Sequence, residues 1–150
     1  MVSFVRVAAL IIICSIIWLN ASIAQDTVSD FEGHWSWGLY ADDKNELPPA
    51  YRNMPLSKVP EYSLELEIKQ QKDKISGHYI STWRFLSKIE EGEFTSTAKG
   101  NETYLNLESG FGGKVRVKLV KDNDSLLWEV IKRNGEDFFH KKVILSKKKQ

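Results

Sequence analysis

The sequence predicts an all-β protein: a single antiparallel meander barrel of about eight strands. From Gly33 onward, apolar and polar residues alternate with a period of two, which is typical of strands with one buried and one solvated face. Short segments rich in Gly, Asn, Asp and Lys separate these runs. No stretch after residue 25 carries a helical stripe of three turns. Closing such strands into a barrel removes the exposed edges of an open sheet.

Each alternating run corresponds to one expected strand. In the third run, for example, Ile75, Gly77, Tyr79 and Trp83 share one side. The expected strands lie at 34–40, 62–68, 75–85, 94–98, 103–108, 114–120, 126–130 and 138–145. The run at 94–98 has the weakest alternation.

The connections between these runs suit hairpins. The segments 71–74, 99–101, 122–124 and 133–136 are short and rich in residues that tolerate turn dihedrals, and Asn134-Gly135 is the strongest signal among them. The glycine-rich segment 109–113 joins two strands and is not followed by a helix. It therefore predicts a mobile hairpin tip rather than a phosphate-binding loop.

The segment 41–60 breaks this pattern, because it has no clear periodicity and contains all four prolines of the chain. A loop this long in a compact domain is usually a functional surface or a disordered excursion, and its prolines reduce the freedom lost on ordering. Tyr51, Arg52 and Met54 are residue types favoured at protein interfaces, so they are the candidate partner-binding residues. The alternative is that the loop plugs one end of the barrel.

The N-terminus has the pattern of a secretory signal peptide. Arg6 supplies a positive charge, residues 7–19 form an apolar core, and Ser22 and Ala24 place small residues at the −3 and −1 positions. That core is shorter than the roughly 20 residues that span a bilayer, although an uncleaved anchor helix is the alternative. We therefore expect a leader at 1–24 and a periplasmic or secreted protein without a stable membrane anchor after cleavage.

The remaining residues, 25–150, are enough for one barrel domain and too few for two. They carry 20 basic and 20 acidic residues, a balance that argues against nucleic-acid binding. The only cysteine, Cys14, lies in the expected leader, so no disulfide, thiol catalysis or cysteine-ligated zinc is expected afterwards. The lack of stapling disulfides favours a bacterial periplasmic protein that relies on its hydrophobic core.

The three histidines are the candidate metal ligands. His34, His78 and His140 fall on the polar faces of different expected strands, and a barrel could bring them together. No H-x-H or H-E-x-x-H spacing supports a metal site, which favours histidines on the surface or at a barrel end. We therefore expect no metal.

Catalytic residues are equally hard to find. The acidic pairs Asp42-Asp43 and Glu90-Glu91 fall in expected turns and loops, where charge is ordinarily solvated. No serine lies in a G-x-S-x-G nucleophile elbow. We therefore expect no enzymatic activity and no cofactor. A hydrolase would require His and carboxylate groups to converge in one cleft.

The four tryptophans after the leader have two interpretations. On alternating strands their rings are most simply barrel core. Alternatively, some of them line a pocket for an apolar or sugar ligand. The residues concerned are Trp35, Trp37, Trp83 and Trp128.

At residues 31–35 the chain resembles the start of calycin barrels, the superfamily of lipocalins and fatty-acid-binding proteins, whose first strand opens with a G-x-W motif. Gly33 and Trp35 match that motif. The overall layout also looks like that of small cysteine-free periplasmic barrels of bacteria, through Trp37-Gly38, the alternating run that begins at Leu64, and Leu127-Trp128. That resemblance implies an inhibitor or immunity protein that neutralises a toxin or a cell-wall-degrading enzyme.

Together these observations predict a non-enzymatic periplasmic binding protein that blocks a protein partner by occlusion. A rigid barrel would present the 41–60 loop, with Tyr51 and Arg52 as anchors, to a cleft of the partner. The alternative is a lipocalin-like carrier of a small apolar ligand, which would require a hollow interior.

Overall fold

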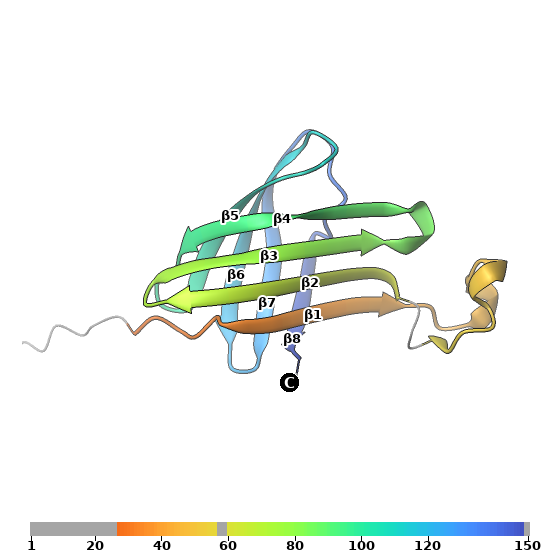
Figure 1. Ribbon diagram of the computed structural model, residues 1–150, viewed down its shortest axis with the longest axis horizontal. Coiled ribbons are helices and arrows are strands. Elements are labelled where there is room, and N and C mark those ends of the chain that lie inside the picture. Colours follow the sequence, from red (N-terminus) through yellow and green to blue (C-terminus); the bar gives the residue numbers. More distant parts are fainter. Residues whose placement is uncertain (1–26, 57–59, 149–150) are drawn as a thin grey trace, which may run out of the picture.

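The computed structural model of this chain describes residues 27–56 and 60–148, so the expected leader at 1–24 lies outside the described residues. Eight antiparallel strands form one sheet in the order β4-β3-β2-β1-β8-β7-β6-β5 (Figure 1). The strands are β1 (Gly33–Tyr40), β2 (Pro60–Gln71), β3 (Lys74–Trp83), β4 (Lys88–Thr97), β5 (Glu102–Glu108), β6 (Lys114–Asp122), β7 (Ser125–Asn134) and β8 (Lys142–Lys147). The predicted all-β meander is confirmed.

The sheet rolls into a nearly closed barrel, with β1 against β8 and the two edge strands β4 and β5 facing each other. Strand β1 meets β8 at two register positions, Trp35 with Lys147 and Ser36 with Ser146. Between β4 and β5 the ladder is replaced by side-chain bonds such as that from Ser96 Oγ to the Tyr104 carbonyl, at 2.7 Å. These bonds satisfy backbone groups that an open edge would leave unpaired.

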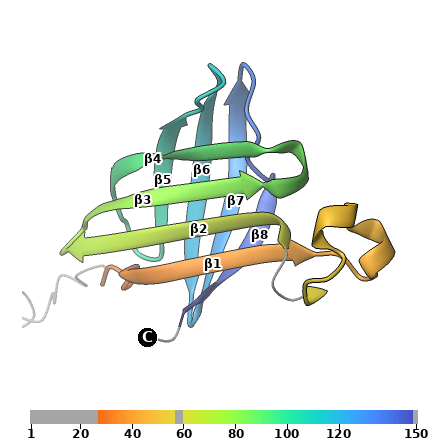
Figure 2. The ribbon, with the colours of Figure 1, turned by 45° about the vertical axis from the view of Figure 1, so that its right-hand side comes forward.

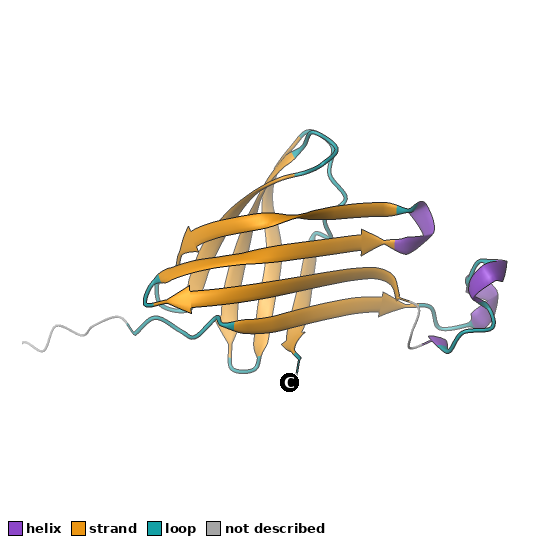
Figure 3. Cartoon of the chain, viewed as in Figure 1, coloured by secondary structure: helices purple, strands orange, loops and turns teal. Residues whose placement is uncertain are grey.

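The helical elements within the described residues are short 3-10 turns (Figure 3). They are η1 (Lys44–Glu46), η2 (Pro49–Tyr51) and η4 (Arg84–Leu86). No helix in this part of the chain is long and apolar enough to cross a membrane.

The interior of the barrel is filled by the inward-facing side chains of all eight strands. Trp35 and Trp128 are fully buried, which confirms their expected place in the core. The cluster around them contains residues such as Phe31, Leu64, Leu66, Ile68, Tyr79, Phe94, Leu105, Val117, Leu119, Leu126, Phe139 and Leu145. Alternation along each strand is the reason these residues meet, since every second side chain points inward.

One end of the barrel is closed by the N-terminal segment 27–32. The amide of Ser29 donates to the Gly100 carbonyl at 2.8 Å, which ties this segment to the β4–β5 connection. Phe31 is buried under the Trp35 indole, whose Nε1 donates to the Phe31 carbonyl at 2.9 Å. The amide of Phe31 in turn donates to Gln70 Oε1 at 2.7 Å.

The G-x-W residues lie at this closed end. Gly33 has φ +135°, a backbone conformation that L side chains rarely adopt, so a substitution there would be strained. The ammonium groups of Lys121 and Lys147 lie 5.0 and 5.5 Å from the Trp35 ring centroid. Their positive charges face the negative π surface of the buried indole.

The opposite end, which we call the mouth, is formed by the connections β1–β2, β3–β4, β5–β6 and β7–β8. The β7–β8 connection, 135–141, folds back over the mouth and buries Phe139 in the core. The β1–β2 loop instead projects away from the barrel (Figure 2). The segment that fills this end is therefore 135–141 and not the 41–60 loop.

Two predicted strands had wrong bounds at the mouth. The last strand begins at Lys142 rather than at residue 138, because Phe138 and Phe139 turn inward as part of the closing segment. Asn134-Gly135 consequently opens a long connection and not a tight hairpin. The strand predicted at 75–85 ends at Trp83 and continues into η4.

A further correction concerns the polarity of the interior. Ser81 faces inward with Tyr79 and Trp83 and is buried. The strand predicted at 94–98 begins at Lys88, and its inward positions include Glu90. Ser81 and Glu90 both keep the alternation of their strands. Each occupies an inward position although its side chain is polar.

Candidate functional site

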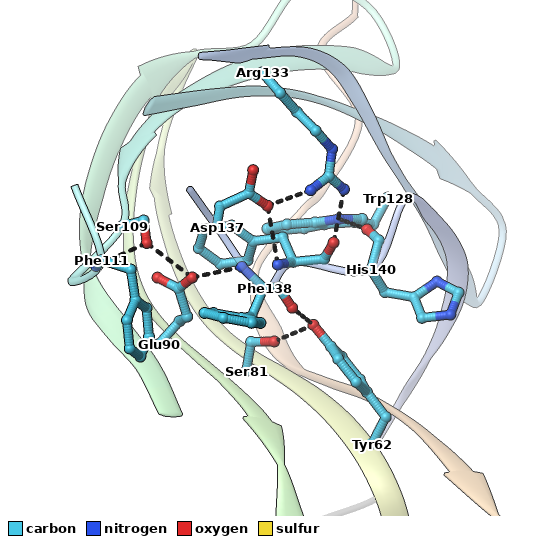
Figure 4. Close-up of polar contacts among 11 residues, drawn as sticks. Tyr62, Ser81, Glu90, Ser109, Phe111, Trp128, Arg133, Asp137, Phe138 and His140 are labelled. Atoms are coloured by element: carbon cyan, nitrogen blue, oxygen red, sulfur yellow. Dashed lines mark hydrogen bonds and ion pairs between the residues drawn. The ribbon is translucent and has the colours of Figure 1, made fainter. Parts of the chain in front are cut away.

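A buried polar network lies under the mouth (Figure 4). Glu90 in β4 is 2% exposed, and its Oε1 accepts hydrogen bonds from Ser109 Oγ at 2.9 Å and from the Phe138 amide at 2.8 Å. Its Oε2 is buried without a partner. The carboxylate therefore joins β4 to both the β5–β6 hairpin and the closing segment. A buried carboxylate with these donors holds the segment more strongly than a neutral acceptor would.

Tyr62 forms the second anchor of the closing segment. Its hydroxyl donates to the Phe138 carbonyl and shares a 2.8 Å hydrogen bond with Ser81 Oγ. Burial raises the pKa of Tyr62, and the nearby negative charge of Glu90 acts in the same direction. Tyr62 is therefore a neutral hydroxyl that donates to the backbone.

The third anchor is an ion pair between Arg133 and Asp137, whose carboxylate side chain is 2% exposed. Asp137 Oδ1 also accepts from the Phe139 amide at 3.1 Å, and Arg133 Nη2 donates to the Phe139 carbonyl at 2.7 Å. Trp128 Nε1 donates to the His140 carbonyl at 3.1 Å. Residues 137–140 are thus fixed from several strands although they have no ladder of their own.

An open cleft of about 430 Å³ lies beside this segment. Its lining residues are Leu39, Glu61, Tyr62, Trp83, Arg133, Asp137, Phe138, Phe139, His140 and Lys141. The rings of Tyr62 and Trp83 have centroids 5.8 Å apart at an interplanar angle of 56°, and those of Trp83 and Phe138 are 6.3 Å apart at 65°. The cleft therefore has aromatic walls that stand at steep angles to each other.

The histidines are placed as the sequence predicted, on the surface and at a barrel end. His34 and His78 lie on the outer face of the sheet, both opposite Glu67 in register. His140 lies at the mouth, with its ring 5.4 Å from Tyr62, and its Nδ1 is buried without a partner. Within residues 27–56 and 60–148, no group of three or more His, Cys, Asp or Glu is arranged to hold a metal ion.

The predicted partner-binding residues lie in the projecting loop. Tyr51 ends η2, and its ring lies 5.7 Å from the Arg84 guanidinium of the β3–β4 connection. Arg52 Nε donates to the Leu47 carbonyl at 3.1 Å and so stabilises the loop itself. Met54 is 39% exposed, which makes it the loop's most accessible large apolar side chain within the described residues.

Other exposed apolar side chains belong to elements at the same end, while Ile80, Tyr104, Ile131 and Ile144 are exposed on other parts of the strands. Leu39 and Tyr40 end β1, Leu86 lies in η4 and Ile89 is the second residue of β4. With Met54 they form what we call the mouth surface: Leu39, Tyr40, Met54, Leu86 and Ile89. These side chains share one end of the barrel, and exposed apolar surface commonly marks an interaction site.

Not every prediction about individual residues was correct. Glu90 was expected in a solvated turn with Glu91, yet it lies inside the barrel while Glu91 faces outward. The tryptophans divide between the two interpretations: Trp35 and Trp128 are core, whereas Trp83 lines the cleft. Trp37 packs against the core and lies 4.9 Å from the His140 ring.

The sequence did not single out Glu90, Tyr62 or Asp137 as site residues. A signal for Glu90 exists, because counting back in steps of two from Phe94 through Gly92 reaches position 90 on the inward face. No comparable signal exists for Asp137, since its burial depends on the path of an irregular segment.

No family model matches the chain, and neither a curated protein nor a solved structure is significantly similar to it. The polar side chains of the buried network are largely hydrogen-bonded to each other and to the backbone, so they stabilise the closing segment. The cleft and the mouth surface remain accessible.

Proposed function

We propose that this protein is a non-enzymatic binding protein that blocks a protein partner by occlusion, in the manner of an inhibitor or immunity protein. The assigned contact area is the mouth surface together with the projecting loop. The observation that carries the proposal is that five exposed apolar side chains belong to elements at one end of a barrel whose interior is packed with buried side chains. A toxin or a cell-wall-active enzyme is the class of partner that the overall layout suggests.

The filled interior favours this function over that of a carrier. A lipocalin-like carrier of an apolar ligand needs a cavity among the inward-facing side chains. Here Trp35, Trp128 and Leu105 belong to the core cluster inside the barrel and have no exposure. The carrier alternative is therefore less well supported than binding at the mouth.

The local order of the loop also supports a binding role. Leu47 is 1% exposed within the loop, Asp43 Oδ1 accepts from the Asn45 amide at 2.8 Å, and Glu46 Oε2 accepts from the Asp42 amide at 3.2 Å. A loop that is already ordered loses less conformational entropy when it binds. It could therefore present Met54 to a partner at a small entropic cost.

The location is part of the proposal. An inhibitor of a cell-wall-active enzyme would act in the periplasm or outside the cell, which the signal-peptide pattern of residues 1–24 would permit. The balanced charge agrees with a protein partner rather than nucleic acid.

Site-specific photo-cross-linking tests the assigned surface. A photoreactive residue replaces Met54 in one variant and Ile144 in another, since Ile144 is 61% exposed on β8 outside the mouth surface. We expect a discrete cross-linked protein from position 54 and none from position 144. With the partner then purified, Met54→Asp should weaken its affinity at least tenfold, because about 1.4 kcal/mol is lost at a contact residue.

Two results would contradict the assigned contact area. Equal labelling from positions 54 and 144, or an affinity unchanged by Met54→Asp, would reject the mouth surface as the contact area. Export is tested separately by N-terminal sequencing of the protein recovered from the periplasm, which should begin at Gln25.

A further inference from the structure

A second open cleft, which we call the outer cleft, lies on the outer face of the sheet over β5, β6 and β7. It has a volume of about 480 Å³ and shares no lining residue with the cleft at the mouth. Charged and amide side chains dominate its lining. They are Asn106, Glu108, Lys114, Arg116, Lys132 and Asn134.

A β-bulge in β7 sets the direction of one of these side chains. Val117 of β6 is the register partner of Val130, and Arg116 is that of Lys132, so Ile131 is an extra residue between them. Val130 is buried, and unbroken alternation would therefore turn Lys132 inward as well. The extra residue instead leaves Lys132 exposed on the outer face. Bulges commonly re-aim a side chain in this way.

The bulge thereby places two positive charges directly opposite each other. Lys132 is the register partner of Arg116, and Arg116 is also the register partner of Asn106 in β5. Opposite residues of this kind have Cβ atoms about 4.5–5.5 Å apart, and like charges there destabilise a sheet. An anion bound between the two side chains would remove this repulsion.

Within the described residues, Arg116 and Lys132 have no acidic partner. The other charges of the lining cancel, because Lys114 Nζ and Glu108 Oε1 form an ion pair at 2.8 Å. The hydrogen bond from Lys114 also lowers the pKa of Glu108, which keeps that carboxylate charged. The outer cleft therefore carries two surplus positive charges, although the acidic and basic residues after the leader balance.

The donors of the outer cleft are available to a ligand. The Arg116 guanidinium lies 5.0 Å from the centroid of the Tyr104 ring, whose hydroxyl donates to Glu102 Oε2 at 3.3 Å. Stacking on a ring orients a guanidinium and leaves its N–H groups free for an oxyanion. Asn106 and Asn134 add side-chain amides that are engaged by no hydrogen bond within the part of the chain that the structure describes.

Two surplus cations match a doubly charged ligand. A phosphate monoester carries about −1.5 to −2 charges at pH 7 and three acceptor oxygens, whereas a carboxylate or a phosphodiester carries a single charge. We propose that the outer cleft binds the phosphate monoester group of a ligand. Arg116 is the bidentate donor, Lys132 the second cation, and Asn106 and Asn134 supply neutral donors. This site is separate from the contact area assigned to the protein partner.

The test uses the purified protein and three probes: methyl phosphate, dimethyl phosphate and acetate. They are titrated at constant ionic strength and at about pH 8, where methyl phosphate is a dianion and the others are monoanions. NMR follows the backbone amides of Arg116 and Lys132 and the Nε–H of Arg116. We expect saturable shifts with methyl phosphate and an affinity about two- to fivefold above those of the two monoanions, which corresponds to one additional exposed charge pair.

Matched variants separate this site from general attraction of anions. Arg116→Gln and Lys132→Gln each remove one surplus charge and should abolish the preference for methyl phosphate, whereas Arg116→Lys keeps the charge and should retain part of it. Lys69→Gln is the control, because Lys69 lines another outer-face cleft, of about 450 Å³, beside the neutral side chains of Ser76 and Thr95. That variant loses the same charge and should bind methyl phosphate as the unchanged protein does.

Thermal unfolding confirms that the variants are folded. Lys132→Gln should not lower the melting temperature, because it removes a like-charge contact between β6 and β7.

Three results would overturn the proposal: no saturable shift at Arg116 and Lys132, equal affinity for the three probes, or the same loss of affinity in Lys69→Gln as in Lys132→Gln. None of these bears on the protein partner, because the probes are titrated without one. The cross-linking at Met54 likewise stands or fails without reference to the outer cleft.

Discussion

The carboxylate of Glu90 in β4 accepts a hydrogen bond from the backbone amide of Phe138, 48 positions later in the chain, at 2.8 Å. This contact fixes the segment that closes the mouth and thereby shapes one wall of the cleft. Because Glu90 also accepts from Ser109 Oγ, one side chain connects three separate parts of the mouth.

The first prediction follows from this contact. Glu90→Ala leaves the Phe138 amide and the Ser109 hydroxyl without their acceptor, so the free energy of unfolding should fall by about 2–3 kcal/mol. Glu90→Gln keeps an acceptor oxygen and should cost less than the alanine variant. Urea unfolding measures both, and Glu91→Ala at the exposed neighbouring position should change stability by less than about 0.5 kcal/mol. Equal stability of the two alanine variants would contradict the role of Glu90.

The second prediction concerns the close approach of the β5–β6 hairpin to the closing segment. A Cβ at Gly113 would collide with the backbone carbonyl of Glu136, whereas one at Gly110 would meet nothing within 4 Å. Gly113→Ala should therefore lower the free energy of unfolding by about 1–3 kcal/mol through overpacking. Gly110→Ala in the same hairpin is the control, and chemical denaturation of both proteins should show a clear difference. Similar stabilities would mean that the segment does not pack here.

The third prediction concerns alkaline pH. Burial raises the pKa of Tyr62 and of Tyr79 above the ordinary value of 10.0, and negatively charged Glu90 raises both further. The folded state therefore favours their neutral forms, and this stability is fully present below about pH 10 and lost as pH rises through the folded pKa values. In a tyrosinate absorbance titration, two tyrosines should ionise late.

Single-residue variants identify which tyrosines ionise late in this titration. Tyr62→Phe and Tyr79→Phe should each remove part of its amplitude, while Tyr40→Phe, at an exposed position, should leave it intact. A late phase unaffected by both core variants would show that other residues cause it.

The fourth prediction concerns the loop. Replacing both Tyr51 and Arg52 with Ala removes the contact with Arg84 and the hydrogen bond to the Leu47 carbonyl. Partner binding should weaken because the loop is less ordered before binding, while the melting temperature should change little, since the loop lies outside the barrel core. Calorimetry measures the melting temperature and a binding isotherm measures the affinity for the partner, with Asn53→Ala as the control. Unchanged affinity in the double variant would place the contact area elsewhere.

The strands could be predicted because their signal is local. Each inward position on β2, from Tyr62 through Leu64 and Leu66 to Ile68, is apolar, so the alternation is visible without knowledge of neighbours. Turn residues such as Asn123, with φ 48° between β6 and β7, marked the hairpins for the same reason.

The mouth could not be predicted in this way. The pair Phe138 and Phe139 looked like the start of the last strand, because a run of apolar residues does not show whether it forms a ladder or folds inward. Asp137 is buried only because Arg133 and the Phe139 amide meet it there. These contacts depend on how distant segments are placed.

The amino-acid sequence alone thus determined the class of fold, the number of strands and most of the core, because period-two alternation and turn chemistry act between near neighbours. The tertiary structure decided the direction in which Glu90 points, the segment that closes the barrel and the rings that surround the cleft. Those features arise where residues from β2, β3, β4 and the β7–β8 connection meet, and no local pattern records contacts between positions so far apart in the chain.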